Sequence, residues 1–401
     1  MNRNSQILIH LLSKAIRNQN PDMIFNEPID WNAVYEEAVA HQVHTLIFPV
    51  LSQLPPEYKP ARELMGVWQK AIKITALFQL QHIHQISIVL NDFNREDIPV
   101  VVLKGLVLRN YYPQPELRTM GDADLLVHKE DMIRAEKLLK AIGYKAGKIS
   151  NKHISFYYMN YPAIELHWAL TDKESREDSL QFSSMIWDNT IDTKINGVPA
   201  LILSAEDQIM HLLFHTVHHL LSTGFGLRQL CDFVLFLEAK DHTINLEDIL
   251  IKADFYHIHK YTIALLLVCN KLLDYKIPDI LYATSNDSYI DLLINDILKA
   301  GVYGRKSQDR DAGTRLLKYI DINESAHKFN SLHNVILFLF PSVHKLSQRY
   351  DYAKKLPLLL PFAWIHRFAN NLKRLNTLQL SKDIETSGKD RAKLLQWLQL
   401  R

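Results

Sequence analysis

The feature that most constrains this chain is a pair of aspartates at the start of an apolar run. Asp122 and Asp124 stand two residues apart, between Gly121 and the apolar residues 125–127. Residues i and i+2 of a β-strand project from the same face of a sheet, so a strand here presents both carboxylates at one place. Paired carboxylates repel each other unless a cation lies between them, and their oxygens suit Mg²⁺. The sequence therefore predicts a metal-binding strand, with a solvated acidic turn as the alternative.

Short runs typical of strands surround this segment. The run 99–103 is β-branched, as buried strands often are, and Asn196-Gly197 between two further runs is a strong hairpin signal. One helix is predicted at 129–142, where Gly143 suits the position just after a helix end. The predicted strands are 99–103, 123–127, 154–159, 163–168, 191–195 and 198–203. We therefore expect a small α+β unit over residues 97–203.

Helical periodicity dominates both sides of this unit. Apolar residues recur at helical spacing between positions 7 and 16, and Asp30 suits the N-cap of a second helix. Ser204 and Asp207 form a capping-box pattern, with Asp in place of the usual Glu. The fold class predicted is therefore α+β, in three parts. These are an N-terminal helical region at 1–96, the core at 97–203 and a C-terminal helical region at 204–401.

Composition excludes several classes of protein. The chain of 401 residues is 47% hydrophobic and 22% charged, with a formal net charge of +2, as in an ordinary globular protein. This charge gives no reason to expect DNA binding. Two cysteines make no disulfide framework and fit a reducing compartment. The N-terminus lacks a signal-peptide pattern and no apolar run is long enough for a membrane span, so we expect a cytoplasmic protein.

Further polar residues stand where they could join the aspartates. Glu165 and His167 alternate with large apolar residues in the predicted strand 163–168, so both project from one face. If this strand lies beside the first, Glu165 completes a cluster of three carboxylates; the alternative is a solvated sheet face. Lys104 and Gly105 follow a strand and precede a helical turn, a placement that offers charge and backbone N–H groups to a phosphate.

These motifs together resemble the nucleotidyltransferase-like superfamily, and most closely a poorly characterised family of large nucleotidyltransferase proteins. The resemblance rests on Lys-Gly at 104–105, Arg118, Gly-Asp-x-Asp-Leu-Leu-Val at 121–127, and Glu-Leu-His-Trp at 165–168. It extends to Asp-Trp at 30–31, Ala-x-x-His-x-Val at 38–43, the helix from Glu206 to His219, and Phe-Pro-Ser at 340–342. It therefore covers most of the chain.

The resemblance implies a nucleotidyltransferase-type mixed sheet and an enzyme that transfers NMP from ATP or another NTP to an acceptor, releasing pyrophosphate. It implies that Asp122, Asp124 and Glu165 are catalytic and hold two Mg²⁺ ions, with Mn²⁺ as a substitute. The predicted nucleotide-binding residues are Lys104, Gly105, Arg118, Gly121 and His167. One departure is the residue after Gly105, which is Leu106 where the superfamily has Gly or Ser.

Two alternatives remain open from the sequence. The altered glycine turn suits a nucleotide- or partner-binding module that has lost catalysis, and a toxin-like enzyme would nucleotidylate a protein or tRNA. The nearly neutral charge favours a small acceptor, while no pattern indicates the acceptor, the base or the oligomeric state. His211, His215 and His219 form a helical stripe, interpreted as structural or substrate-facing rather than metal-binding. Arg228 and Asp232 are interpreted as a pair on a helix surface or between domains.

Overall fold

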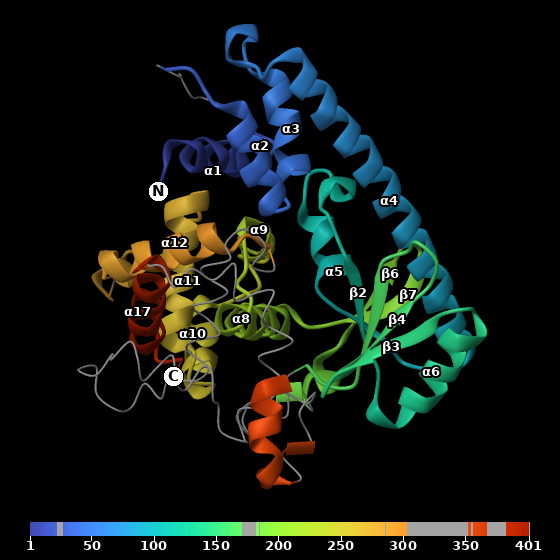
Figure 1. Cartoon of the computed structure of the whole chain (residues 1–401). Helices are drawn as coiled ribbons and strands as arrows, with labels where there is room; N and C mark the ends of the chain where they lie inside the picture. Colours follow the sequence, from blue (N-terminus) through green and yellow to red (C-terminus); the bar gives the residue numbers. More distant parts are fainter. Residues whose placement is uncertain are drawn as a thin grey trace. The chain divides into compact units, whose positions relative to one another are not determined.

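The computed structural model describes residues 1–21, 27–170, 182–183, 185–284, 286–302, 352–353, 356–366 and 382–400 (Figure 1). The chain packs as two compact units. The first contains residues 1–218 and 226–285, and the second contains residues 219–225 and 286–401. The three-part division expected from the sequence stays a prediction. The Phe-Pro-Ser motif at 340–342 lies outside the described residues.

The first unit contains a seven-stranded mixed sheet, which confirms the predicted α+β class. The strand order is β3-β4-β5-β2-β1-β7-β6. Strand β2 is parallel to β5, and β1 is parallel to β7, whereas the remaining neighbours are antiparallel. The strands are β1 (Val101–Val102), β2 (Asp122–Leu126), β3 (Lys145–Ile149), β4 (His153–Tyr157), β5 (Ala163–His167), β6 (Ile191–Ile195) and β7 (Val198–Ile202). The sequence patterns predicted every strand except β3.

The hairpin of β6 and β7 turns where Asn196-Gly197 predicts it. Asn196 and Gly197 have φ angles of 49° and 84°. Positive φ at both central residues defines the type I′ turn, whose twist matches that of the flanking strands. The turn therefore fixes the register that pairs Ile195 with Val198.

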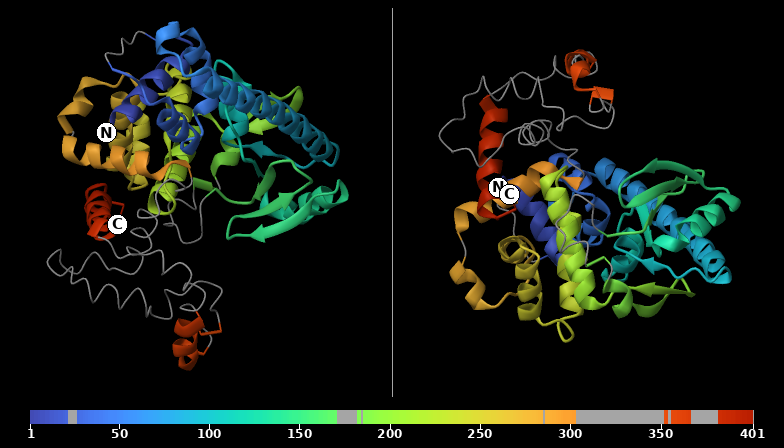
Figure 2. Two further views of the ribbon diagram at one scale, coloured as in Figure 1. Left: turned by 45° about the horizontal axis from the view of Figure 1, so that its top comes forward. Right: turned by 90° about the horizontal axis from the view of Figure 1, so that it is seen from below.

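The central strands carry different chemistry on their two faces. On β2 and β5 the alternating residues Ala123, Leu125, Ile164 and Leu166 are fully buried. They join a core with α4 (Arg62–Arg95) and α6 (Met132–Ala141), to which Phe93 contributes a fully buried ring. Figures 1 and 2 show the long helix α4 running along the sheet. Burying each large side chain contributes about 1.5–3 kcal/mol, so this face is fixed by packing and the other is left for polar groups.

The remaining helices of the first unit come from the segments before and after the sheet. Helix α1 packs against α3 and α11. Asp30 caps α2 by accepting a hydrogen bond from the Ala33 backbone N–H at 3.1 Å, as predicted. One half of the predicted capping box is present, since the Asp207 N–H donates to Ser204 Oγ at 3.2 Å, while the Ser204 hydroxyl donates to Asp207 Oδ2 at 2.8 Å. These helices are α1 (Arg3–Ala15), α2 (Trp31–Ala40), α3 (His44–Gln53), α8 (Ala205–Leu221), α9 (Leu227–Ala239), α10 (Leu246–Phe255) and α11 (His259–Leu273).

The second unit pairs α12 (Asp287–Ala300) with α17 (Lys382–Trp397). Arg391 on α17 donates to both carboxylate oxygens of Asp296 on α12, at 2.7 and 2.8 Å. The rings of Tyr289 and Trp397 stack with centroids 4.9 Å apart. Among the helices that the structure describes, none has both the length and the apolar character needed to cross a bilayer.

Candidate active site

The polar face of β2 and β5 brings the predicted carboxylates together. The two strands are parallel and in register, with Asp122 opposite Ala163 and Asp124 opposite Glu165. Asp124 and Glu165 therefore project side by side from the face that α4 and α6 do not cover. Each has a carboxylate oxygen near His167 Nε2, at 2.9 Å for Asp124 and 3.5 Å for Glu165.

Lys104 is the cation of this face. It follows β1 and precedes the short helix α5 (Gly105–Leu108), and its Nζ lies 2.9 Å from Asp124 Oδ1. Burial disfavours the ammonium, but Asp124 and Asp122 outweigh it and raise the pKa of Lys104, so the side chain stays charged. Its backbone has φ 46° and ψ −118°, a combination that is strained for a residue with a side chain. The surrounding structure thus holds Lys104 in a costly conformation that aims its amine at Asp124.

The two aspartates differ in their electrostatic surroundings. Burial and the neighbouring carboxylate of Asp124 raise the pKa of Asp122 to about 6. Burial acts in the same sense on Asp124, but Lys104 and the hydrogen bond to His167 hold the pKa of Asp124 well below its usual range. Lys104 and His167 contact the carboxylate of Asp124 directly, whereas for Asp122 the effects of Lys104 and Arg228 are smaller than those of burial and of the Asp124 carboxylate.

A histidine that the sequence interpretation missed completes this face. His153 on β4 lies directly opposite His167 on β5, and its Nε2 is 3.6 Å from Glu165 Oε1. Burial lowers the pKa of His153 below its usual value. The signal that could have identified His153 is the pairing of its strand with β5, which has a polar face. Burial and the charge of Lys104 push the pKa of His211, in the α8 stripe, well below its ordinary value.

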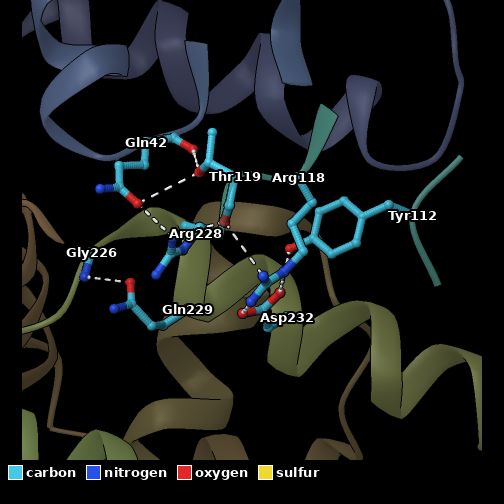
Figure 3. A network of polar contacts seen from close by, with 8 residues as sticks. All are labelled: Gln42, Tyr112, Arg118, Thr119, Gly226, Arg228, Gln229 and Asp232. Carbon is cyan, nitrogen blue, oxygen red and sulfur yellow. Dashed lines mark hydrogen bonds and ion pairs between the residues drawn. The ribbon is translucent and has the colours of Figure 1, made fainter. Parts of the chain in front are cut away.

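Arg118 lies in a buried network that Figure 3 shows. Its Nε and Nη2 donate to the two oxygens of Asp232 on α9, at 2.7 and 2.6 Å, and the Tyr112 hydroxyl donates to the same carboxylate at 2.7 Å. A Cβ on Gly105 would lie 2.8 Å from Arg118 Nη1 and 3.0 Å from Met120 Sδ, so a larger residue there would have to displace these side chains. The phosphate-binding role expected for Arg118 stays a prediction, and its charge is already neutralised by Asp232.

The interpretation of Arg228 and Asp232 on α9 as a pair, on a helix surface or between domains, is wrong. Both side chains are buried, and Asp232 binds Arg118 instead. Arg228 Nη1 donates to the Thr119 carbonyl oxygen at 2.9 Å and to Gln42 Oε1 (Figure 3). No carboxylate of the described residues pairs with Arg228, its Nε has no hydrogen-bond partner there, and its charge acts to lower the pKa of Asp122. The structure thus adds a buried, uncompensated cation close to the aspartates.

The remaining predicted residue, Gly121, has open space where a Cβ would be. The structure gives no steric reason for glycine at this position. The face as a whole therefore contains Lys104, Asp122, Asp124, Glu165 and His167, while Arg118 points to α9. The roles predicted for these residues stay predictions.

A mixed sheet with a covered apolar face and a carboxylate-bearing face agrees with the nucleotidyltransferase-type α+β core that the sequence resemblance implies. The chain belongs to the uncharacterised nucleotidyltransferase family, whose model matches residues 27–274. This match spans more than half of the chain and confirms the family and the class of enzyme expected from the sequence motifs. No curated protein matches the sequence.

Solved structures with similar folds are distant. The crystal structure of ANT(2″)-Ia in complex with adenylyl-2″-tobramycin is 13% identical, with a TM-score of 0.35 over 44% of this chain and 97% of that one. An antigenic nucleotidyltransferase-like protein from Paracoccidioides brasiliensis is 12% identical, with a TM-score of 0.32 over 49% of this chain and 94% of that one.

Proposed function

We propose that this protein transfers NMP from an NTP to an acceptor, with the carboxylate face of β2 and β5 as its active site. The observation that carries the proposal is the alignment of Asp124 with Glu165 on adjacent parallel strands, beside Asp122 and within the matched region 27–274. The reaction is attack of an acceptor hydroxyl or phosphate on the α-phosphorus, with pyrophosphate as the leaving group.

The residues present fit divalent cations. Burial and the carboxylate of Asp124 raise the pKa of Asp122 even though Lys104 and Arg228 act in the opposite sense, so additional positive charge beside Asp122 would be stabilising. Asp122, Asp124 and Glu165 would hold Mg²⁺ or Mn²⁺ through oxygen ligands. Such ions, when bound, neutralise the charge that develops on a transferring phosphoryl group. Metal dependence is part of this proposal.

Two protein cations are proposed to bind the triphosphate. Lys104 reaches the carboxylates directly, and Arg228 has a buried guanidinium without a carboxylate partner among the described residues. Burying a charge without a counterion costs desolvation free energy, and binding an anionic ligand beside Arg228 would offset that cost. Arginine suits this task because its planar group can donate two hydrogen bonds to a phosphate.

The acceptor is proposed to be a small molecule in the cytoplasm. The net charge of +2 offers no broad basic surface for a nucleic acid, and the two cysteines are buried and unpaired.

One observation favours a second candidate function. The amine of Lys104 already binds Asp124, a predicted metal ligand, at 2.9 Å. A protein cation in that place suits a module that binds a nucleotide without transferring it. The two candidates differ in whether the α–β phosphate bond is broken.

The test is to incubate the full-length protein with each α-labelled NTP and Mg²⁺ or Mn²⁺, with acceptor pools of small metabolites, and to follow pyrophosphate release. Asp122→Asn should lower the rate about 100-fold or more, because a lost metal ligand removes several kcal/mol of transition-state stabilisation. Glu130→Gln is the matched control, since Glu130 is an exposed acid close by in sequence.

Metal-dependent NTP binding with no turnover in any pool would favour the non-catalytic module. Equal turnover by the wild type and Asp122→Asn would contradict the proposed active site.

A further inference from the structure

Two histidines and a glutamate meet on the polar face of β4 and β5. The antiparallel register places His153 directly opposite His167, and Glu165 opposite Ser155. Glu165 and His167 are two residues apart, so all three side chains project from the same face. The backbone pairing alone therefore brings two imidazoles and one carboxylate to a single place, next to Asp124.

The distances between their ligand atoms suit a shared metal ion. Glu165 Oε1 is 3.6 Å from His153 Nε2, and Glu165 Oε2 is 3.5 Å from His167 Nε2. Zinc lies about 2.0–2.2 Å from nitrogen and oxygen ligands, which at tetrahedral angles separates two ligands by about 3.4 Å. The three ligand atoms lie within 4.8 Å of one another, and no other group of three His, Cys, Asp or Glu side chains in the described part of the chain does so.

The cluster is sheltered but accessible. The His167 side chain is 4% exposed, whereas Glu165 is 26% and His153 is 15% exposed. An ion could therefore enter past Glu165 and retain an open position toward solvent or substrate. Ions held by three protein ligands with one open position are typical of catalytic rather than purely structural sites.

We infer that His153, Glu165 and His167 form a binding site for a divalent transition-metal ion that favours imidazole ligands, such as Zn²⁺. Imidazole nitrogen is a ligand for transition metals, whereas Mg²⁺ prefers an all-oxygen shell with several waters. To hold the ion, His167 Nε2 would give up its hydrogen bond to Asp124 and the ring would keep its proton on Nδ1, so that Asp124 would retain Lys104 as its partner. The site shares Glu165 with the proposed function, but ion binding is measurable without any transfer reaction.

The experiment uses full-length protein without a histidine tag, stripped of metal with a chelator. Zn²⁺, Mn²⁺ and Mg²⁺ are titrated by calorimetry, and Co²⁺ is added as a spectroscopic probe for nitrogen ligation. We expect one tight transition-metal site and weaker Mg²⁺ binding. His153→Ala and Glu165→Gln should each weaken Zn²⁺ binding by at least about tenfold. Even the loss of a residue that only hydrogen-bonds to a metal ligand lowers metal affinity by about this factor. His153 is the preferred variant because it is the more exposed histidine.

His242→Ala is the matched control, since His242 is exposed and outside the cluster, and it should bind as the wild type does. Asp122→Asn should also retain the site. The inference is overturned if His153→Ala and Glu165→Gln, both folded by circular dichroism, bind Zn²⁺ and Co²⁺ like the wild type. It is equally overturned if Asp122→Asn alone abolishes binding. Metal binding without nucleotidyl transfer would contradict the proposed function and leave this site standing.

Discussion

At the scale of single residues, the buried charges divide into those with partners and those without. Arg118 and Asp232 each have about 5% of the side chain exposed and form two parallel hydrogen bonds. Asp232 holds the pKa of Arg118 above its usual value even though burial acts against the charged form. Replacing one partner of such a buried ion pair is destabilising, because the other partner is left as a buried charge without a counterion.

We therefore predict that Asp232→Leu lowers the free energy of unfolding by about 3–5 kcal/mol, since it strands Arg118 and leaves Tyr112 without its acceptor. The double variant Arg118→Met/Asp232→Leu should lose much less, because no charge is left buried. Chemical denaturation of both variants and the wild type measures the difference. A double variant at least as unstable as the single one would show that the pair itself stabilises the fold.

At the scale of elements, the sequence predicted what depends on local pattern. The alternation of Ile164, Glu165, Leu166 and His167 correctly indicated a strand with one apolar face, and the register of β2 with β5 then followed from burial of that face. Strand β3 was missed because all five of its residues are exposed, so it carries no apolar alternation. The helix predicted from Lys129 begins later, at Met132, after a single 3₁₀ turn.

The contacts of the candidate site were harder to predict than its strands. Asp232 lies 114 residues after Arg118, and His153 reaches Glu165 only through the hairpin of β4 and β5. Sequence spacing gives i, i+4 neighbours on a helix, which is why Arg228 seemed the partner of Asp232. Asp232 is buried within α9, and a buried carboxylate needs a closely placed hydrogen-bond donor. Arg118 supplies that donor, so Asp232 pairs with Arg118 rather than with Arg228.

Helix α4 carries a buried histidine whose protonation should affect stability. His82 is fully buried, and neither ring nitrogen has a hydrogen-bond partner among the described residues. Burial, helped by Arg109, lowers the pKa of His82 from 6.5 to about 4. The unfolded chain therefore binds more protons than the folded one between these values. The free energy of unfolding must fall as the pH decreases through this range.

We predict that His82 accounts for about 2 kcal/mol of lost stability between pH 7 and pH 5, and that His82→Leu removes this loss. Urea unfolding of the wild type and the variant at the two pH values tests it. His84→Leu is the control, because His84 is exposed on the same helix and its replacement should leave the pH dependence unchanged. An unaltered pH dependence in His82→Leu would contradict the argument.

At the scale of the whole molecule, packing joins segments that the sequence separates. Ser13 Oγ on α1 donates to Asp274 Oδ2 at 2.7 Å, and Arg17 donates to the Leu273 carbonyl oxygen at 2.7 Å. Helix α1, which precedes the matched region 27–274, and the end of α11 thus belong to one compact unit with the sheet. Changes of periodicity near residues 97 and 204 mark a change of element type. They carry no information on which helices pack together, because that depends on side-chain fit over more than 250 residues.

The division into two compact units leads to a prediction about local stability. Arg391 in the second unit is 3% exposed, binds both oxygens of Asp296 and donates to the Leu220 carbonyl oxygen. Arg391→Met removes the charge-assisted hydrogen bonds to the Asp296 carboxylate and should cost about 1.5–3 kcal/mol in that unit. Hydrogen–deuterium exchange should then become faster in peptides from α12 and α17 and stay unchanged in β2 and β5. Lys393→Met, an exposed change on the same helix, controls for loss of charge. Equal acceleration in every peptide would mean that the two units unfold as one.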